Sequence, residues 1–349
     1  MRFPWARWRA WWAASSSSTC SSGGTAVSAS ALRLEGHERR LLLLGALAVL
    51  CVGVFMTVDA GGRWDFVLPF RARKVATVLL VGYAIAVSTV LFQTVTENRV
   101  LTPAIMGFDT LYVLLQTCLL FFLGSRTVAA LDPRLLFAVE VTVMVLFSAV
   151  LHRWLFQGAG RSIHLLLLTG VVLGVLFRSL STFLQRVIAP GEFAFLEDRF
   201  FASFNNPDPD LLAVSALMTV GASVLGLRLL HACDVLGLGR DVAISLGVDH
   251  RRTVSRLLAV VAVLVSVSTA LVGPVTFFGL LVANLAHGLV RSHRHVHVLP
   301  AAVFLAVIGL LGGQLVLERV FSFGANLRVI IEFLGGLMFI TLLMRGALR

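Results

Sequence analysis

Long apolar runs fill most of this chain, and they limit its possible folds more than any other feature of the sequence. Leu41–Val58 and Leu299–Val320 are typical, with few charged side chains among leucine, valine and alanine. The hydrocarbon core of a bilayer is about 30 Å thick and a helix rises about 1.5 Å per residue, so a spanning helix needs roughly 20 residues. In lipid, helices and closed barrels satisfy their backbone hydrogen bonds, and these runs lack the alternation of barrel strands. The runs therefore predict an all-α, polytopic membrane bundle.

About ten membrane spans can be drawn from these runs. The predicted spans are Leu41–Val58, Val75–Gln93, Thr102–Leu123, Leu135–Leu155, His164–Val187, Leu211–His231, Val254–Val272, Phe277–Arg291, Leu299–Val320 and Leu327–Met344. The composition agrees, because 13% of the residues are charged, whereas an ordinary soluble domain carries about 25%. An even number of spans places both termini on the same side of the membrane.

The distribution of charge predicts the orientation of the bundle. The formal net charge of +11 would suggest nucleic acid in a soluble chain, but here most arginines lie at span ends. One side holds Arg39, Arg40, Arg99, Arg153, Arg161, Arg240, Arg251, Arg252, Arg256, Arg291, Arg294, Arg345 and Arg349. The other side holds Asp59, Asp65, Asp132, Glu192, Glu197, Asp198, Asp208 and Asp210. Because basic residues favour cytoplasmic loops, we expect both termini in the cytoplasm. The exception is Phe70–Lys74, a basic cluster on the predicted external side.

Two segments lie outside this pattern of spans. Residues 1–38 combine tryptophan, arginine and a Ser/Gly-rich stretch. We interpret them as a flexible cytoplasmic tail and predict no cleaved signal peptide. The membrane domain is then 39–349. A start codon placed too far upstream is an alternative origin for this tail. Residues 192–204 place phenylalanine and leucine on one helical face, which predicts a short external helix in the membrane interface.

The sequence offers little for catalysis or metal binding. The four cysteines, Cys20, Cys51, Cys118 and Cys233, have no metal-ligand spacing. No G-x-x-x-x-G-K-[ST] motif is present, so ATP chemistry would need a separate subunit. His293, His295 and His297 alternate in a predicted cytoplasmic loop, and imidazole suits several transition metals. Because that loop lacks carboxylates, we interpret it as a solvated basic loop and predict no metal site, no catalytic residue and no cofactor.

Residues 234–252 interrupt the apolar runs with a short, partly charged segment. Gly239 can begin a helix, Asp241 lies in its first turn, where the helix dipole favours an anion, and Gly247 can end it in the left-handed conformation. Leu238 and Leu246 lie on one face of this helix. Physical reasoning leaves two alternatives open: a linker that covers the base of the bundle, or a docking site for a soluble partner.

This segment resembles the coupling loop of the iron-siderophore and cobalamin ABC importer permeases, the FecCD type. Its pattern, LxLGxxxAxxLGV, matches at Leu236, Leu238, Gly239, Ala243, Leu246, Gly247 and Val248. Three further family motifs follow the family order. They match at Arg71, Lys74, Gly82, Gln93, Asn98, Pro103 and Gly107, at Gly273, Phe277, Gly279 and Leu280, and at Gly335, Phe339, Leu342 and Leu343. The resemblance extends from Leu41 to the C-terminus.

The sequence also departs from the family pattern. Ala283 and Asn284 replace a Pro-His pair, His287 replaces an arginine, and Arg240 stands where glutamate is common. The motif around Glu318 and Arg319 matches loosely, and the ELPxG that follows it in the family is absent. The stretch from Asn98 to Thr117 is similar to the branch that forms one half of a heterodimeric siderophore permease.

The resemblance implies a function and a set of roles. The chain would be the permease subunit of an ABC importer of ferric siderophores in the bacterial cytoplasmic membrane. Its partners would be a cytoplasmic ATPase, a second homologous permease subunit, and an extracytoplasmic siderophore-binding protein. The ATPase would contact Leu238, Gly239, Arg240, Ala243, Leu246 and Gly247; the binding protein would contact Arg71, Lys74 and Arg319; and Gln93, Asn98 and Arg178 would border the pathway.

Simpler roles remain open for several of these residues. Arg71 and Lys74 could anchor lipid headgroups, and Arg319 could pair with Glu318. Arg178 lies in mid-span, where a charge costs about 2.5–3.5 kcal/mol on insertion scales. It could pair internally, for instance with Glu140, or attract an anionic chelate from a cavity wall. Gln93 and Asn98 could cap helices. At the level of function, the alternatives are cobalamin or haem as cargo, an ATP-independent secondary transporter, and a membrane scaffold.

Overall fold

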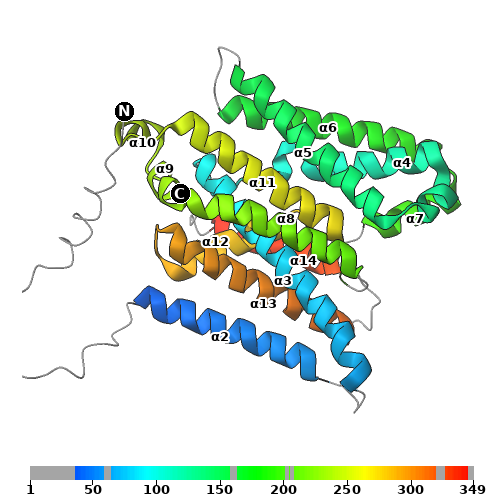
Figure 1. Ribbon diagram of the computed structural model, residues 1–349, viewed down its shortest axis with the longest axis horizontal. Helices are drawn as coiled ribbons and strands as arrows, with labels where there is room; N and C mark the ends of the chain where they lie inside the picture. The colour runs from blue at the N-terminus through cyan, green and yellow to red at the C-terminus, as the bar shows by residue number, and fades with distance from the viewer. Residues whose placement is uncertain are drawn as a thin grey trace, which may run out of the picture. The chain divides into compact units, whose positions relative to one another are not determined.

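The computed structural model describes residues 36–58, 64–157, 163–200, 204, 208–319 and 327–344, and the elements in these ranges are helical (Figure 1). The helices are α2 (Gly36–Thr57), α3 (Trp64–Val95), η1 (Pro103–Met106), α4 (Phe108–Ala130), α5 (Pro133–Gln157), α6 (Ile163–Val187), α7 (Pro190–Phe200), α8 (Pro209–Arg228), α9 (Leu230–Leu236), α10 (Arg240–Ser245), α11 (His250–Val272), α12 (Phe278–Val290), α13 (His295–Arg319) and α14 (Leu327–Met344). Gly36–Arg349 cluster as one unit. The predicted tail lies outside the described residues except for its last three.

The predicted all-α membrane bundle is confirmed: eight of the ten predicted spans each correspond to one helix, and the other two are each divided between two helical elements. Among the described residues, eight helices are long and apolar enough to cross a membrane. The helix α12 is apolar but has 13 residues, fewer than the roughly 20 that a full span requires.

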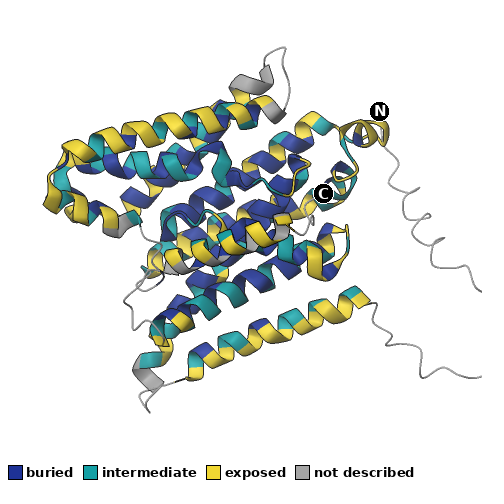
Figure 2. Ribbon diagram, turned by 180° about the vertical axis from the view of Figure 1, so that it is seen from behind, coloured by how far each residue is buried: buried dark blue, intermediate teal, exposed yellow. Residues whose placement is uncertain are grey.

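Two helices form the centre of the bundle. Within their most apolar windows, 72% of the α3 residues and 67% of the α11 residues are buried, against 11% for α2 (Figure 2). Phe92 of α3 and Leu264 of α11 are fully buried. The periphery, including α2, keeps its exposed apolar side chains for lipid or for partner subunits.

Small residues allow close helix contacts where apolar burial alone gives little driving force in lipid. A Cβ on Gly170 of α6 would come within 2.8 Å of the Met106 Cα in η1, and a Cβ on Gly279 of α12 would collide with the Thr89 hydroxyl. Substituting either glycine would push two elements apart. These contacts bring η1 against α6 and α12 against the central helix α3.

Two predicted spans are divided in the structure. The span expected at Thr102–Leu123 consists of η1 and α4, which are separated by Gly107 in the left-handed region (φ 89°). The span expected at Leu211–His231 ends as α8 at Arg228, and α9 begins after Leu229. Leucine does not signal a break, so this division could not be read from the sequence.

A helix lies where the external segment 192–204 was predicted, although α7 begins at Pro190 and ends at Phe200. Proline is well suited to the first turn of a helix, which explains the earlier start. Leu196 is buried against Leu120 of α4 and Ile188, so the apolar face of α7 contacts the bundle. Its position relative to a membrane stays a prediction.

Candidate functional site

The segment 234–252 forms a short helical projection that presents apolar side chains outward. The predicted α10 is present, with Gly239 before it (φ 99°) and Gly247 after it (φ 85°), both in conformations that favour glycine. The N–H of Val248 donates to the carbonyl of Ala243 at 3.0 Å, which closes the helix end in a Schellman-type turn.

The two sides of α10 differ sharply in exposure. Ala243 is completely buried, whereas Leu238 is 62% exposed and Leu246 is 61% exposed. Val242 and Ile244 are also exposed. A cluster of exposed large apolar residues at the end of a bundle marks an interaction surface. We call Leu238, Val242, Ile244 and Leu246 the α10 surface.

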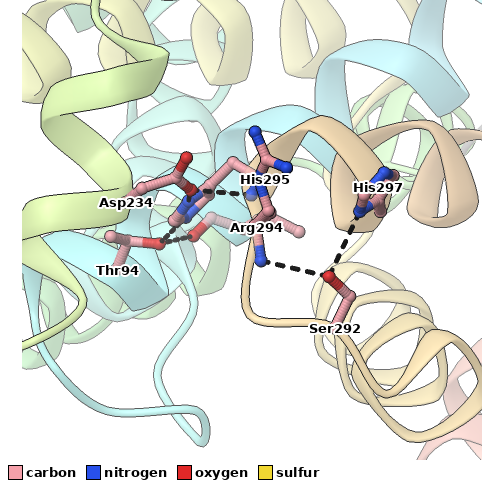
Figure 3. Close-up of polar contacts among 7 residues, drawn as sticks. Thr94, Asp234, Ser292, Arg294, His295 and His297 are labelled. Atoms are coloured by element: carbon pink, nitrogen blue, oxygen red, sulfur yellow. Dashed lines mark hydrogen bonds and ion pairs between the residues drawn. The ribbon is translucent and has the colours of Figure 1, made fainter. Parts of the chain in front are cut away.

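The polar side chain of Asp234, one turn before the α10 projection, is bonded to a histidine from a distant part of the chain. The Nδ1 atom and the backbone N–H of His295 both donate to Oδ1 of Asp234, at 2.7 and 2.8 Å, and Nε2 lies 2.7 Å from the Thr94 hydroxyl (Figure 3). His295 is 5% exposed. The prediction of a solvated histidine loop without carboxylate partners is therefore wrong at His295. The partner is remote in sequence, so alternation of histidines could not reveal it.

At the other end of α3, Arg71 caps the C-terminus of α2. Its guanidinium donates to the carbonyls of Phe55, Met56 and Val58 at 2.9, 3.3 and 2.6 Å. These carbonyls have no partner within the helix, and they carry the negative end of its dipole. Arg71 therefore serves the fold directly by holding α2 against α3.

Lys74 lies one turn further along α3 and is buried. Its Nζ lies 3.2 Å from Oε1 of Glu318 on α13, and Gln314 donates to the same oxygen at 3.0 Å. Arg319, next to this pair, is exposed. The predicted docking residues are thus close together at one end of α3 and α13, but Arg71 and Lys74 face inward.

Arg178 is exposed on α6 and lines a cavity of about 770 Å³. The cavity wall also includes Asp109 and Thr110 of α4 and Thr276 and Phe277 before α12. The alternative partner, Glu140, instead accepts a hydrogen bond from Gln116 at 2.6 Å. The structure therefore favours the cavity-wall interpretation of Arg178.

Gln93 and Asn98 position the loop that leads to this cavity. Gln93 is buried and donates to the carbonyl of Arg99 at 2.7 Å, and Asn98 accepts from the N–H of Val100 at 2.9 Å. Asn284 of α12 donates to the same Arg99 carbonyl at 3.2 Å. Val100 lines the cavity, whereas Gln93 and Asn98 are not among its lining residues. Asn284 was noted in the sequence as a departure from a motif, without a role.

The chain resembles known membrane transport proteins in both sequence and fold. The sequence pattern of the FecCD transport family matches residues 41–345. The petrobactin import system permease protein YclO of Bacillus subtilis is 47% identical over 88% of this chain and 98% of its own length. The petrobactin import system permease protein FatC of Bacillus anthracis is 34% identical over 91% of this chain and 92% of its own. An inward-facing metal-chelate type ABC transporter superposes with a TM-score of 0.77 at 20% identity, over 88% of this chain and 99% of its own.

Proposed function

The chain belongs to the FecCD transport family, as the permease subunit of an ABC importer of ferric siderophores in the cytoplasmic membrane, and we propose that its cargo is a petrobactin-class chelate. The ATPase of such an importer is a separate subunit. The cargo assignment is supported by two relatives, both of which are named as petrobactin import permeases.

The single observation that carries the proposed mechanism is the α10 surface. We propose that this surface docks in the ATPase, with both chain termini on the same, cytoplasmic side. Leu238 and Leu246 supply the apolar contact, while Gly239 and Gly247 allow the tight turns that project them. The buried Ala243 fixes α10 to the bundle, and Arg240 is exposed beside the contact. A linker that merely covered the bundle would bury these leucines.

The second proposed contact lies at the far ends of α3 and α13. We assign binding-protein docking to this end, with Arg319 and the neighbouring Arg73 as its exposed cations. Arg71 and Lys74 hold this end in shape through α2 and Glu318. Their role is to stabilise the fold at this end, because their own charges are already engaged.

The proposed pathway follows the Arg178 cavity, which a second permease subunit closes. Arg178 is exposed in the middle of a span, where contact with lipid is costly and a polar cavity or another subunit is the usual environment. A homologous partner packed against α6 would cover Arg178 and enclose the cavity. The loop held by Gln93 and Asn98 then forms one border of the route.

Uptake of radioactive iron tests this function directly. The chain would be expressed, with a second permease subunit and the ATPase, in a bacterial strain that lacks its own siderophore permeases. We expect accumulation of iron supplied as ferric petrobactin, and none when the ATPase is omitted. Ferric citrate, haem and cobalamin serve as competing cargoes. Uptake of cobalamin instead of ferric petrobactin would refute the proposed cargo. Uptake without the ATPase would refute the assignment as an ABC importer.

A further inference from the structure

We propose that Asp234 and His295 form a tie that transmits movement of the α10 surface to α13 and α3. The tie consists of Asp234, His295 and Thr94, and it makes Asp234 and His295 positioning residues for transport. This inference rests on the proposed docking of the ATPase on α10.

Helices α9 and α10 form one rigid unit. The turn between them is hydrogen-bonded throughout, from Gly237 N–H to the Cys233 carbonyl at 3.0 Å and from Gly239 N–H to the Leu236 carbonyl at 3.0 Å. Cys233, Leu236 and Ala243 are all buried in the same core cluster. A push on Leu238 or Leu246 is therefore carried to Asp234.

Asp234 binds the beginning of α13 through two hydrogen bonds. Its carboxylate accepts from the backbone N–H of His295, the first residue of α13, and from the His295 ring. A carboxylate at a helix N-terminus satisfies a free N–H and favours the positive end of the dipole. Asp234 thus acts as a cap that is supplied by another element, and α13 begins where α9 holds it (Figure 3).

A cavity occupies part of the space between α9 and α13, which reduces the apolar contact between them. A cavity of about 410 Å³ is lined by Gly226 and Leu230 on one side and by Leu299 and Val303 of α13 on the other. His295 lines the same cavity. Because side chains across an unfilled space make no dispersion contact, apolar packing there transmits force poorly. The charged hydrogen bonds connect the two sides.

Helices α3 and α13 connect the tie to the opposite end of the bundle. The ring of His295 contacts Thr94 near the end of α3, and at the opposite ends of the same two helices Lys74 pairs with Glu318. Polar contacts at both ends make α3 and α13 a braced pair. Movement that enters at Asp234 can therefore reach the proposed binding-protein end without a change in either helix.

The test compares single variants in the complex assembled with its ATPase and binding protein, reconstituted in vesicles. Asp234→Ala removes both hydrogen bonds to α13, and His295→Ala removes the ring contacts with Asp234 and Thr94 but keeps the backbone N–H. Ser292→Ala is the matched control, since the Ser292 hydroxyl lies in the loop before α13 and contacts His297 at 3.2 Å and the Arg294 N–H at 3.3 Å. The readout is chelate transported per ATP hydrolysed, a ratio that loss of folded complex alone does not change.

We expect both alanine variants to retain the ATPase and to hydrolyse ATP. The ratio of chelate transported to ATP hydrolysed should fall at least about tenfold, because the loss of one charged hydrogen bond changes an equilibrium constant by about that factor. The double variant should fall by less than the product of the two single effects, because both single variants lose the bond between the Asp234 carboxylate and the His295 ring. Asp234→Asn, which keeps an acceptor oxygen, should restore part of the ratio. An unchanged ratio in both alanine variants, or an equal fall in Ser292→Ala, would overturn the tie. Failure of the wild-type chain to bind an ATPase would refute the proposed function itself.

Discussion

The two ends of α3 and α13 were both predicted to dock soluble partners, and the structure treats them differently. At one end, α10 leaves Leu238 and Leu246 largely exposed. At the other end, Arg71 is engaged by three backbone carbonyls and Lys74 by Glu318. A motif match therefore identifies a region of the chain. The exposure of each side chain then distinguishes residues that can contact a partner from residues that support the surface.

The largest effect should come from charging the α10 surface. In the Leu238→Asp/Leu246→Asp double variant, two carboxylates would enter an apolar interface, where an unpaired charge is strongly unfavourable. We expect iron uptake to fall to the level of cells without the permease, at normal amounts of membrane-inserted protein. Leu238→Met/Leu246→Met is the control and should transport normally. Normal uptake by the double Asp variant would show that the α10 segment is only a linker.

The next largest effect should be on stability at the opposite end. Lys74→Ala leaves the Glu318 carboxylate partly buried without its cation, and breaking such a pair costs about 3 kcal/mol. We expect a lower midpoint of thermal unfolding in detergent, with wild-type affinity for the binding protein among the molecules that remain folded. Lys74→Met/Glu318→Leu should recover most of the stability. If Lys74→Ala instead unfolded like wild type and lost binding-protein affinity, Lys74 would be a direct docking residue.

A smaller effect is expected for the cap on α2. Arg71→Ala removes a cation from the negative end of α2 together with its hydrogen bonds, which corresponds to about 1–2 kcal/mol. The measurement is again the unfolding midpoint, with Arg73→Ala as the matched control because Arg73 is exposed on the same helix. We expect Arg71→Ala to lower the midpoint and Arg73→Ala to leave it unchanged. Equal midpoints would show that the cap is dispensable.

The smallest expected effect concerns Arg178, between the two ends. Arg178→Gln removes a positive charge from the cavity wall but keeps a polar side chain, so we expect uptake of an anionic chelate to fall severalfold. Stability and ATPase association should not change. Uptake measured at increasing chelate concentration separates weaker binding from slower transport. A large loss of stability would show that Arg178 makes a structural ion pair instead.

The sequence predicted the helical bundle and the α10 segment well, because both depend on local patterns. Apolar length predicts a span, and Gly239 and Gly247 bracket α10 through conformations that local sequence encodes. The roles of Lys74 and His295 could not be predicted in this way. Their partners, Glu318 and Asp234, are remote in the chain, and the contact depends on how the helices pack. The predicted loop role of His295 was therefore wrong, although its position was noted.

The departures from the family motif show the same limit. Asn284 was recognised as a substitution, but its bond to the Arg99 carbonyl depends on the approach of α12 to the loop after α3. Gly279 makes this approach possible because a Cβ there would collide with Thr89. A glycine in an apolar run signals close packing in general, and the sequence does not say against which element.

Cross-linking in the assembled complex tests directly whether the ATPase docks on the α10 surface. A cysteine at Leu246→Cys would be compared with one at Leu217→Cys, which is 75% exposed on α8. Cys20, Cys51 and Cys118 would be replaced by serine, and Cys233 would stay unreactive because burial raises the pKa of its thiol to about 12. With a maleimide–succinimidyl ester reagent, we predict a permease–ATPase adduct from Leu246→Cys and none from Leu217→Cys. An adduct from Leu217→Cys with none from Leu246→Cys would contradict docking of the ATPase on the α10 surface.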